Sequence, residues 1–288
     1  MPKNLGAAFW LSHPEAQSLP LMSKITEASV RDDLAAAHRI CHKLGLNEGV
    51  CNHLSALLPG YEDRFLVCPY GLLWSEVTPE SLVVITSEGK VIQGEGEVDI
   101  SAFEIHLAMH AVNPERNNTV LHTHMPYTTA LCCIEREKLP NSERLQMISQ
   151  NALRFYKEVA YDDEFNGFVL DNQEGDRLAS WLKEKRVGLQ KHHGVFVCGK
   201  TVSEAFDDMY YLEQAAKVQV LAMSTNIPLA LVDEETCKAT KKSFDEAKAK
   251  FSRPHLDAWK RQLLRDDPKL HWLDSSVNQL NDGKTGGA

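Results

Sequence analysis

The stretch Val120-Leu121-His122-Thr123-His124-Met125-Pro126-Tyr127 decides how the rest of the chain is interpreted. Together with Asn118 and Thr119 before it, this stretch predicts a strand over Asn118–His124, which ends just before Pro126 starts a helix. Side chains two residues apart on a strand point to the same face, so His122 and His124 are expected to present two imidazoles side by side at a strand end. Imidazoles suit zinc, iron, manganese or cobalt, although two histidines also share a strand face by chance.

A second histidine pair lies much later in the chain, in Lys191-His192-His193-Gly194. The flanking segments Val187–Gln190 and Val195–Cys198 are predicted to be strands, so Gly194 indicates a tight turn that directs an imidazole inward. A site with three histidines leaves positions open for water or substrate, whereas structural metal sites are closed. The two segments together therefore favour a catalytic metal centre over a structural one.

The composition excludes several other classes of function. The 288 residues carry a formal net charge of −9, and no run of Lys and Arg offers the basic footprint of a nucleic-acid-binding protein. Apolar stretches such as Leu82–Thr86 are strand-sized, far below the ~20 residues of a membrane-spanning helix, and no signal peptide is expected. The seven cysteines include no CxxC pair and are expected to be reduced thiols. We therefore expect a cytoplasmic protein that acts on a small molecule and binds neither nucleic acid nor membrane.

Strands and helices are mixed along the chain without an internal repeat, which predicts one α/β or α+β domain. The other strands are expected at His53–Leu57, Arg64–Cys68, Ser81–Thr86, Lys90–Gln93 and Phe168–Leu170. Helices are expected at Thr26–Leu44, Ser101–Val112, Pro126–Glu135, Glu143–Tyr156, Asp171–Lys183, Thr201–Ser224 and Lys238–Lys250. The first helix is well marked, because Thr26 can cap its start and Gly45 can end it. We expect an extended arm over Met1–Ser23 and a disordered tail over Asn281–Ala288.

From about Val30 to Thr225 the chain resembles the class II aldolase and adducin superfamily. The marks of the resemblance are Asn52-His-Leu-Ser55, Pro69-Tyr-Gly-Leu72, the Phe103–His110 helix, Pro114, His122–Tyr127, Ser149-Gln150, His193-Gly194 and Thr201–Tyr211. The resemblance implies a single-domain α/β/α sandwich with a central, mainly antiparallel sheet, and a homotetramer with sites at subunit contacts. It divides the chain into an arm over 1–23, the class II aldolase/adducin-like domain over 24–228, and a C-terminal helical extension and tail over 229–288.

The resemblance also implies one divalent metal ion, usually zinc, held by His122, His124 and His193. All three histidines are present. Fe(II), manganese and cobalt are the other ions that imidazoles suit. The neighbouring His192 is expected to point away if the local backbone is extended. Adducin head domains lack a working metal site and serve as structural proteins, so the intact set favours an enzyme.

The phosphate cradle of the sugar-phosphate aldolases in this family is largely replaced. The matching positions, which are candidates for substrate binding, are Ser55, Tyr70, Gly71 and Ser101. His53, Tyr70 and Ile100 stand where those aldolases have glycines and small hydroxyl residues, and Val50 stands where a polar residue is expected. Most of the groups that cradle a phosphate are therefore missing.

The catalytic Glu of those aldolases is replaced as well, because the alignment puts Ala102 at its position. Glu104 lies two residues further, about 200° around a helix, and reaches the site only if the helix start is shifted; otherwise it is a surface or interface carboxylate. His53 is a candidate acid or base, because an imidazole acts near neutral pH. Tyr127 is a candidate to donate a proton or orient substrate. Both are alternatively plain structural residues.

Three hypotheses about function follow. The first is a carbon–carbon lyase, an aldolase or decarboxylase, in which the metal stabilises the enediolate formed from a small hydroxy or keto compound without phosphate. The second is a non-haem iron oxygenase on an aromatic or keto acid, an activity of a few proteins resembling this superfamily. The third is a non-catalytic, adducin-like interaction module, which predicts that the protein contains no metal.

Overall fold

One mixed sheet runs through the part of the chain that the structure describes. The computed structural model describes residues 25–165, 167 and 172–273, and eight strands within them lie in the order β4-β3-β2-β1-β5-β8-β7-β6. All neighbouring strands are antiparallel except β6 and β7, which are parallel. The strands are β1 (His53–Leu57), β2 (Arg64–Val67), β3 (Val83–Thr86), β4 (Val91–Gln93), β5 (Thr119–Thr123), β6 (Val159–Asp162), β7 (Val187–Gln190) and β8 (Val195–Gly199).

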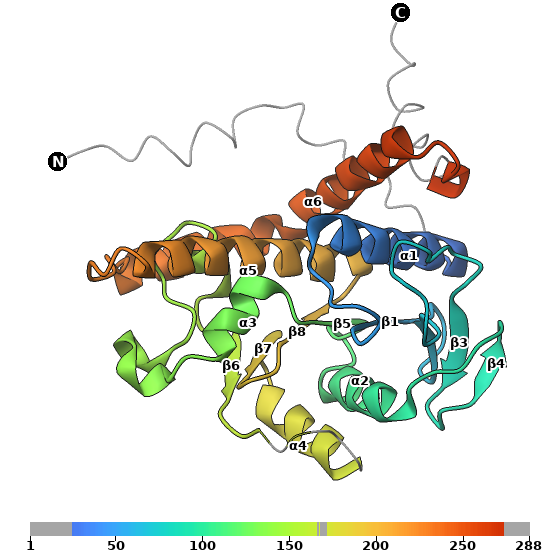
Figure 1. Ribbon diagram of the computed structural model, residues 1–288, viewed down its shortest axis with the longest axis horizontal. Coiled ribbons are helices and arrows are strands. Elements are labelled where there is room, and N and C mark those ends of the chain that lie inside the picture. The colour runs from blue at the N-terminus through green and yellow to red at the C-terminus, as the bar shows by residue number, and fades with distance from the viewer. Residues whose placement is uncertain (1–24, 166, 168–171, 274–288) are drawn as a thin grey trace, which may run out of the picture.

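Helices cover both faces of this sheet (Figure 1). Those on one side are α1 (Glu27–Leu44), α5 (Val202–Met223) and α6 (Glu234–Asp266), with α3 (Pro126–Cys132) packed against α5, and those on the other side are α2 (Ile100–Val112) and α4 (Asn172–Leu182). This arrangement confirms the predicted α/β/α sandwich with a mainly antiparallel sheet. None of the helices described has both the length and the apolar character needed to span a membrane.

Strand β5 is buried along its whole length, and its alternation fixes the face on which each histidine lies. Leu121 packs into the core that α1 and α5 cover, whereas Val120 packs into the core that α2 and α4 cover. His122, two residues after Val120, therefore faces the α2 side. The register pairs His122 with His53 on β1 and with Phe196 on β8, so three rings lie in a row across the sheet.

The structure corrects the predicted elements in three places. The segment Glu143–Tyr156, predicted to be helical, is irregular apart from a 3₁₀ turn at Ala152–Phe155. Part of its backbone bonds to a side chain on α5 instead of continuing a helix, since the Gln146 N–H donates to the Gln219 side-chain oxygen at 2.7 Å. Strand β6 follows and was not predicted. Helix α6 has 33 residues and extends well beyond the predicted Lys238–Lys250.

Buried charges hold the long α6 against α1. The Lys260 ammonium is fully buried and contacts the Asp33 carboxylate, which also accepts a hydrogen bond from Arg253 at 2.5 Å. The helix continues through Pro254, because this packing outweighs the one backbone hydrogen bond that proline removes. Three predicted segments fall outside the described residues: the strand Phe168–Leu170, the arm Met1–Ser23 and the tail Asn281–Ala288.

Candidate metal centre and adjoining pocket

Three imidazoles from two distant segments converge at one end of the central strands. His122 lies near the end of β5, His124 follows just beyond it, and His193 lies in the turn between β7 and β8. One ring nitrogen from each residue lies within 4.8 Å of the others. The ring centroids are 4.8 to 5.1 Å apart. A cluster of imidazoles this tight has the donor type and spacing that could hold a divalent metal ion.

Hydrogen bonds from behind orient two of these rings. His122 Nδ1 lies 3.0 Å from the Val195 carbonyl oxygen, which can only accept, so Nδ1 carries the proton and Nε2 keeps its lone pair. His124 Nδ1 lies 2.8 Å from Glu48 Oε2, and His124 Nε2 is buried without a hydrogen-bond partner in the described part of the chain. Carbonyls and carboxylates commonly support metal-ligating histidines in this way. The orphaned Nε2 atom therefore fits a metal ion.

The turn that carries His193 presses against the end of β5, and Gly194 makes the approach possible. A Cβ atom at Gly194 would lie 2.6 Å from the Thr123 carbonyl oxygen and 2.8 Å from His124 Cδ2. His192 is exposed and does not join the triad, as expected. The reason differs from the expected one, because its backbone is left-handed (φ +58°) rather than extended.

His53 stands between the three histidines and a neighbouring pocket. Its ring is nearly parallel to that of His122, with centroids 6.1 Å apart, and Phe196 packs against His122 from the next strand at 4.4 Å. Burial lowers the pKa of His53 to about 4. Burial, followed by the neighbouring imidazoles, holds the pKa of His122 well below its ordinary value. Both rings are therefore neutral at pH 7, and the neutral form of imidazole is the one that binds metal.

A second group of histidines lies behind the pocket and is joined through Ser55. The Ser55 hydroxyl lies 2.6 Å from His106 Nδ1 and 2.8 Å from His110 Nε2, while His110 Nδ1 contacts the Asn117 carbonyl oxygen. Burial lowers the pKa of His110 to about 4 and the pKa of His106 well below its ordinary value. Ser55, a predicted substrate contact, is fully buried, and its hydroxyl is occupied by these two rings.

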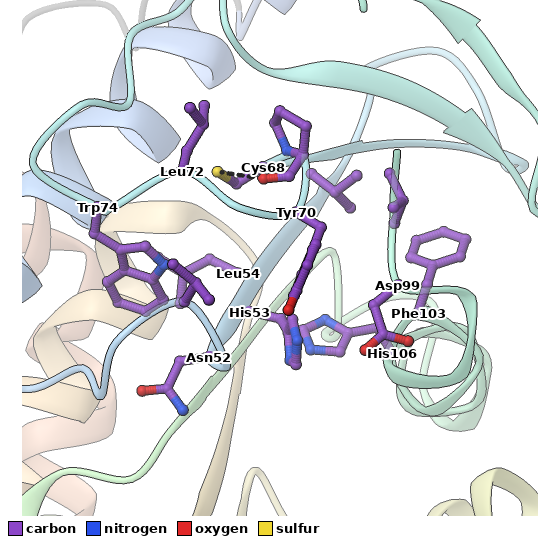
Figure 2. Close-up of a pocket in the computed structure, with 14 residues that line it drawn as sticks. Asn52, His53, Leu54, Cys68, Tyr70, Leu72, Trp74, Asp99, Phe103 and His106 are labelled. Carbon is purple, nitrogen blue, oxygen red and sulfur yellow. Dashed lines mark hydrogen bonds between the residues drawn. The ribbon is translucent and has the colours of Figure 1, made fainter. Parts of the chain in front are cut away.

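The pocket opens beside His53 (Figure 2) and encloses about 470 Å³, part of it open to solvent. Apolar and aromatic side chains form most of its wall. Tyr70 is 61% exposed at the edge, and Asp99 is the one charged side chain among the described lining residues. Asn52 and His106 also line it, and each has a buried nitrogen without a partner in the described chain, namely Asn52 Nδ2 and His106 Nε2.

The other predicted site residues lie in different places. Gly71 is in the turn after Tyr70, with a φ of +95°. Ser101 is in the first turn of α2, and its side chain falls outside the described part. The Tyr127 N–H donates to Glu213, and its ring packs 5.5 Å from Lys217 Nζ rather than against the pocket.

Glu104 lies where α2 meets α4. Its carbonyl oxygen would be 3.3 Å from a Cβ atom at Gly175, and it does not line the pocket. The sequence reasoning also missed two site residues. Glu48 comes from the loop before β1, and no local pattern marks it as a partner of a histidine 76 positions away. His106 carried a usable signal, because His110 lies four residues later on the same helical face.

Comparisons with known proteins agree with this architecture. Residues 32–220 match the family described as "Class II Aldolase and Adducin N-terminal domain". The chain is 33% identical to the "Putative aldolase class 2 protein" of Caulobacter vibrioides, over 72% of this chain and 79% of that protein. It is 29% identical to the "Decarboxylase NovR" of Streptomyces niveus, over 67% of this chain and 70% of that protein.

Solved structures give the same result for the fold. An aldolase II superfamily protein from Pseudomonas syringae superposes with a TM-score of 0.76 at 28% identity, covering 88% of this chain and 97% of that one. The L-fuculose 1-phosphate aldolase from Glaciozyma antarctica PI12 superposes with a TM-score of 0.73 at 25% identity, covering 84% and 92% respectively.

Proposed function

Because this chain belongs to the class II aldolase and adducin family, we propose that it is a metal-dependent carbon–carbon lyase of the aldolase or decarboxylase type. The substrate is a small hydroxy or keto compound without a phosphate group. The observation that carries the proposal is the convergence of His122, His124 and His193 beside a pocket. The similarity to one protein named as a decarboxylase and another named as an aldolase supports lyase chemistry.

The three histidines are the proposed ligands of one divalent ion, with zinc as the first choice. When bound, the ion supplies a Lewis acid that polarises a substrate oxygen as the neighbouring carbon–carbon bond breaks. The chain's own groups prepare the site for it. The Val195 carbonyl and the Glu48 carboxylate hold His122 and His124 in the tautomer that keeps a lone pair free on Nε2.

His53 is the proposed acid or base. Among the predicted catalytic residues it is the one that both lines the pocket and stacks on a metal histidine, so it lies where a proton must move. Tyr127 and Glu104 stay predictions, as do substrate contacts from Gly71 and Ser101. Tyr70 is a proposed substrate contact, because it lies at the edge of the pocket.

Metal analysis of protein purified without an affinity tag is the test. We expect close to one divalent ion per chain in the native protein and in His192→Ala, the matched control, and loss of both metal and activity in His122→Ala. Iron together with substrate-dependent oxygen uptake would overturn the lyase in favour of the oxygenase. If the purified protein contains no metal and chelators leave its behaviour unchanged, the result would favour the adducin-like module instead.

Two further expectations belong to this proposal. A homotetramer would match the family, and light scattering on the purified protein measures its mass directly. A cytoplasmic location is expected from the reduced thiols, and fractionation of cells that express the full chain tests it.

A further inference from the structure

The hydrogen bonds around Ser55 fix which nitrogen of His106 carries a proton. The Asn117 carbonyl oxygen can only accept, so His110 Nδ1 must be protonated. A neutral His110 can then only accept at Nε2, so the Ser55 hydroxyl donates its one hydrogen bond to that atom. The Ser55 oxygen is left to accept from His106 Nδ1. His106 Nε2 is therefore a bare lone pair, and the low pKa of buried His110 supports this chain of assignments.

The ring that carries this lone pair forms part of the pocket wall. His106 lines the pocket, whereas Ser55, which occupies Nδ1, does not (Figure 2). Nε2 is thus the ring's remaining polar atom, and it is buried without a hydrogen-bond partner in the described chain. A buried polar atom left unpaired destabilises a protein, so a ligand that pairs with it gains affinity.

The charge of the pocket restricts what this ligand can be. No Lys or Arg is among the described residues of the wall, and Asp99 adds a negative charge. A phosphate or carboxylate on the part of the substrate near His106 would face the Nε2 lone pair, with no Lys or Arg side chain of the described wall to balance its charge. The aromatic side chains Tyr70, Trp74 and Phe103 instead offer apolar surface.

We infer that His106 is a specificity residue, whose Nε2 accepts a hydrogen bond from a neutral hydroxyl group on an apolar part of the substrate. Ser55, His110 and Asn117 act as positioning residues, because they hold His106 in the accepting tautomer. The inference rests on the proposed function only in taking this pocket as the place for the part of the substrate that does not react. Binding alone tests it, so its failure is distinct from a failure of the lyase proposal.

Calorimetry with three uncharged probes gives the first test. Benzyl alcohol can donate a hydrogen bond, benzyl methyl ether can only accept one, and ethylbenzene does neither. We expect native protein to bind benzyl alcohol about fivefold more tightly than the other two, the factor that one net neutral hydrogen bond provides. Equal affinities for the three probes, or a preference for the ether, would overturn the inference.

Variants distinguish the roles of the two ring nitrogens of His106. His106→Asn keeps a polar group near Nδ1 for Ser55 and removes the pocket-facing acceptor, so the preference for the alcohol should vanish. His106→Gln, the matched control, places an amide near the Nε2 position and should keep part of the preference. Ser55→Ala removes the group that keeps the proton of His106 on Nδ1, so Nε2 can carry the proton and donate to the ether, whose affinity should rise. Unchanged preferences in His106→Asn would contradict the assignment.

A further test uses native protein alone and so does not depend on the folding of any variant. In native protein labelled with ¹⁵N-histidine, the imidazole nitrogen shifts report each tautomer directly. Several rings should have an unprotonated Nε2, and we expect the one whose signal moves when benzyl alcohol is added to be His106. If no such ring responds to the alcohol, or if the ring that responds has a protonated Nε2, the inference fails.

Discussion

Replacing Gly194 by alanine tests whether the turn after β7 sets the geometry of the candidate metal centre. The added methyl carbon would lie 2.6 Å from the Thr123 carbonyl oxygen and 2.8 Å from the His124 ring. Neither neighbour is a flexible chain end, because Thr123 belongs to the central strand β5 and His124 is held by Glu48. The clash therefore has to be relieved by moving the turn that carries His193.

The size of this movement follows from the contacts. Ordinary van der Waals contact begins near 3.4 Å, so the turn and the end of β5 must separate by roughly 0.6–0.8 Å in a close-packed interior. Metal–ligand distances tolerate only about 0.2 Å. We expect zinc affinity to fall by ~10–100-fold, as when a ligand loses its support, together with ~1–3 kcal/mol of unfolding free energy from overpacking.

Gly199→Ala is the matched control at the other end of β8. Its methyl carbon would lie 2.7 Å from the Ala205 nitrogen on α5, a comparable clash remote from the histidines. Zinc affinity is measured by competition with a chromophoric chelator, and stability by urea unfolding in excess EDTA. Gly194→Ala should lose both zinc affinity and stability, whereas Gly199→Ala should lose stability alone. Native zinc affinity in folded Gly194→Ala, or equal zinc loss in both variants, would refute the reasoning.

Three other predictions address the supports of the fold and site. Glu48→Gln should lower zinc affinity about tenfold by weakening the group behind His124, with unfolding unchanged because Glu48 is 74% exposed; equal affinity would exclude this role. Asp33→Asn removes the carboxylate that buried Lys260 contacts and should lower the unfolding free energy by ~3–5 kcal/mol, whereas Lys260→Met should cost much less; equal losses in calorimetry would contradict the ion-pair argument. Burial lowers the pKa of His38 from its ordinary 6.5 to about 4, so the unfolded chain binds the extra proton first. The contribution of neutral His38 to the free energy of unfolding is complete above pH 6.5, and up to about 3 kcal/mol of it is lost as the pH falls towards 4. Urea unfolding at several pH values should therefore show a shallower pH dependence of stability in His38→Gln.

The parts of the site that the sequence predicts are those set by local geometry. Strand alternation alone placed His122 and His124 together, and the glycine after His193 indicated the turn that completes the triad. The resemblance then supplied the sandwich. Each of these signals lies within a few residues of the group it concerns, so a single sequence contains it.

The parts that escaped prediction depend on contacts between distant segments. Glu48 supports His124 only because the loop before β1 lies beside the end of β5, and nothing around Glu48 encodes that contact. The segment Glu143–Tyr156 has helical spacing, but Gln219 on α5 binds its backbone and replaces helical bonds with tertiary ones. In both cases a polar side chain far along the chain decides the local outcome.

Three buried nitrogens at the candidate centre and its pocket are suited to pairing with a metal ion or a ligand. His124 Nε2, His106 Nε2 and Asn52 Nδ2 are all buried without a hydrogen-bond partner in the described chain. Each such atom destabilises the protein by ~1–3 kcal/mol, a large amount against a typical total of ~5–15 kcal/mol. A metal at the first atom and a neutral ligand at the others would offset this loss.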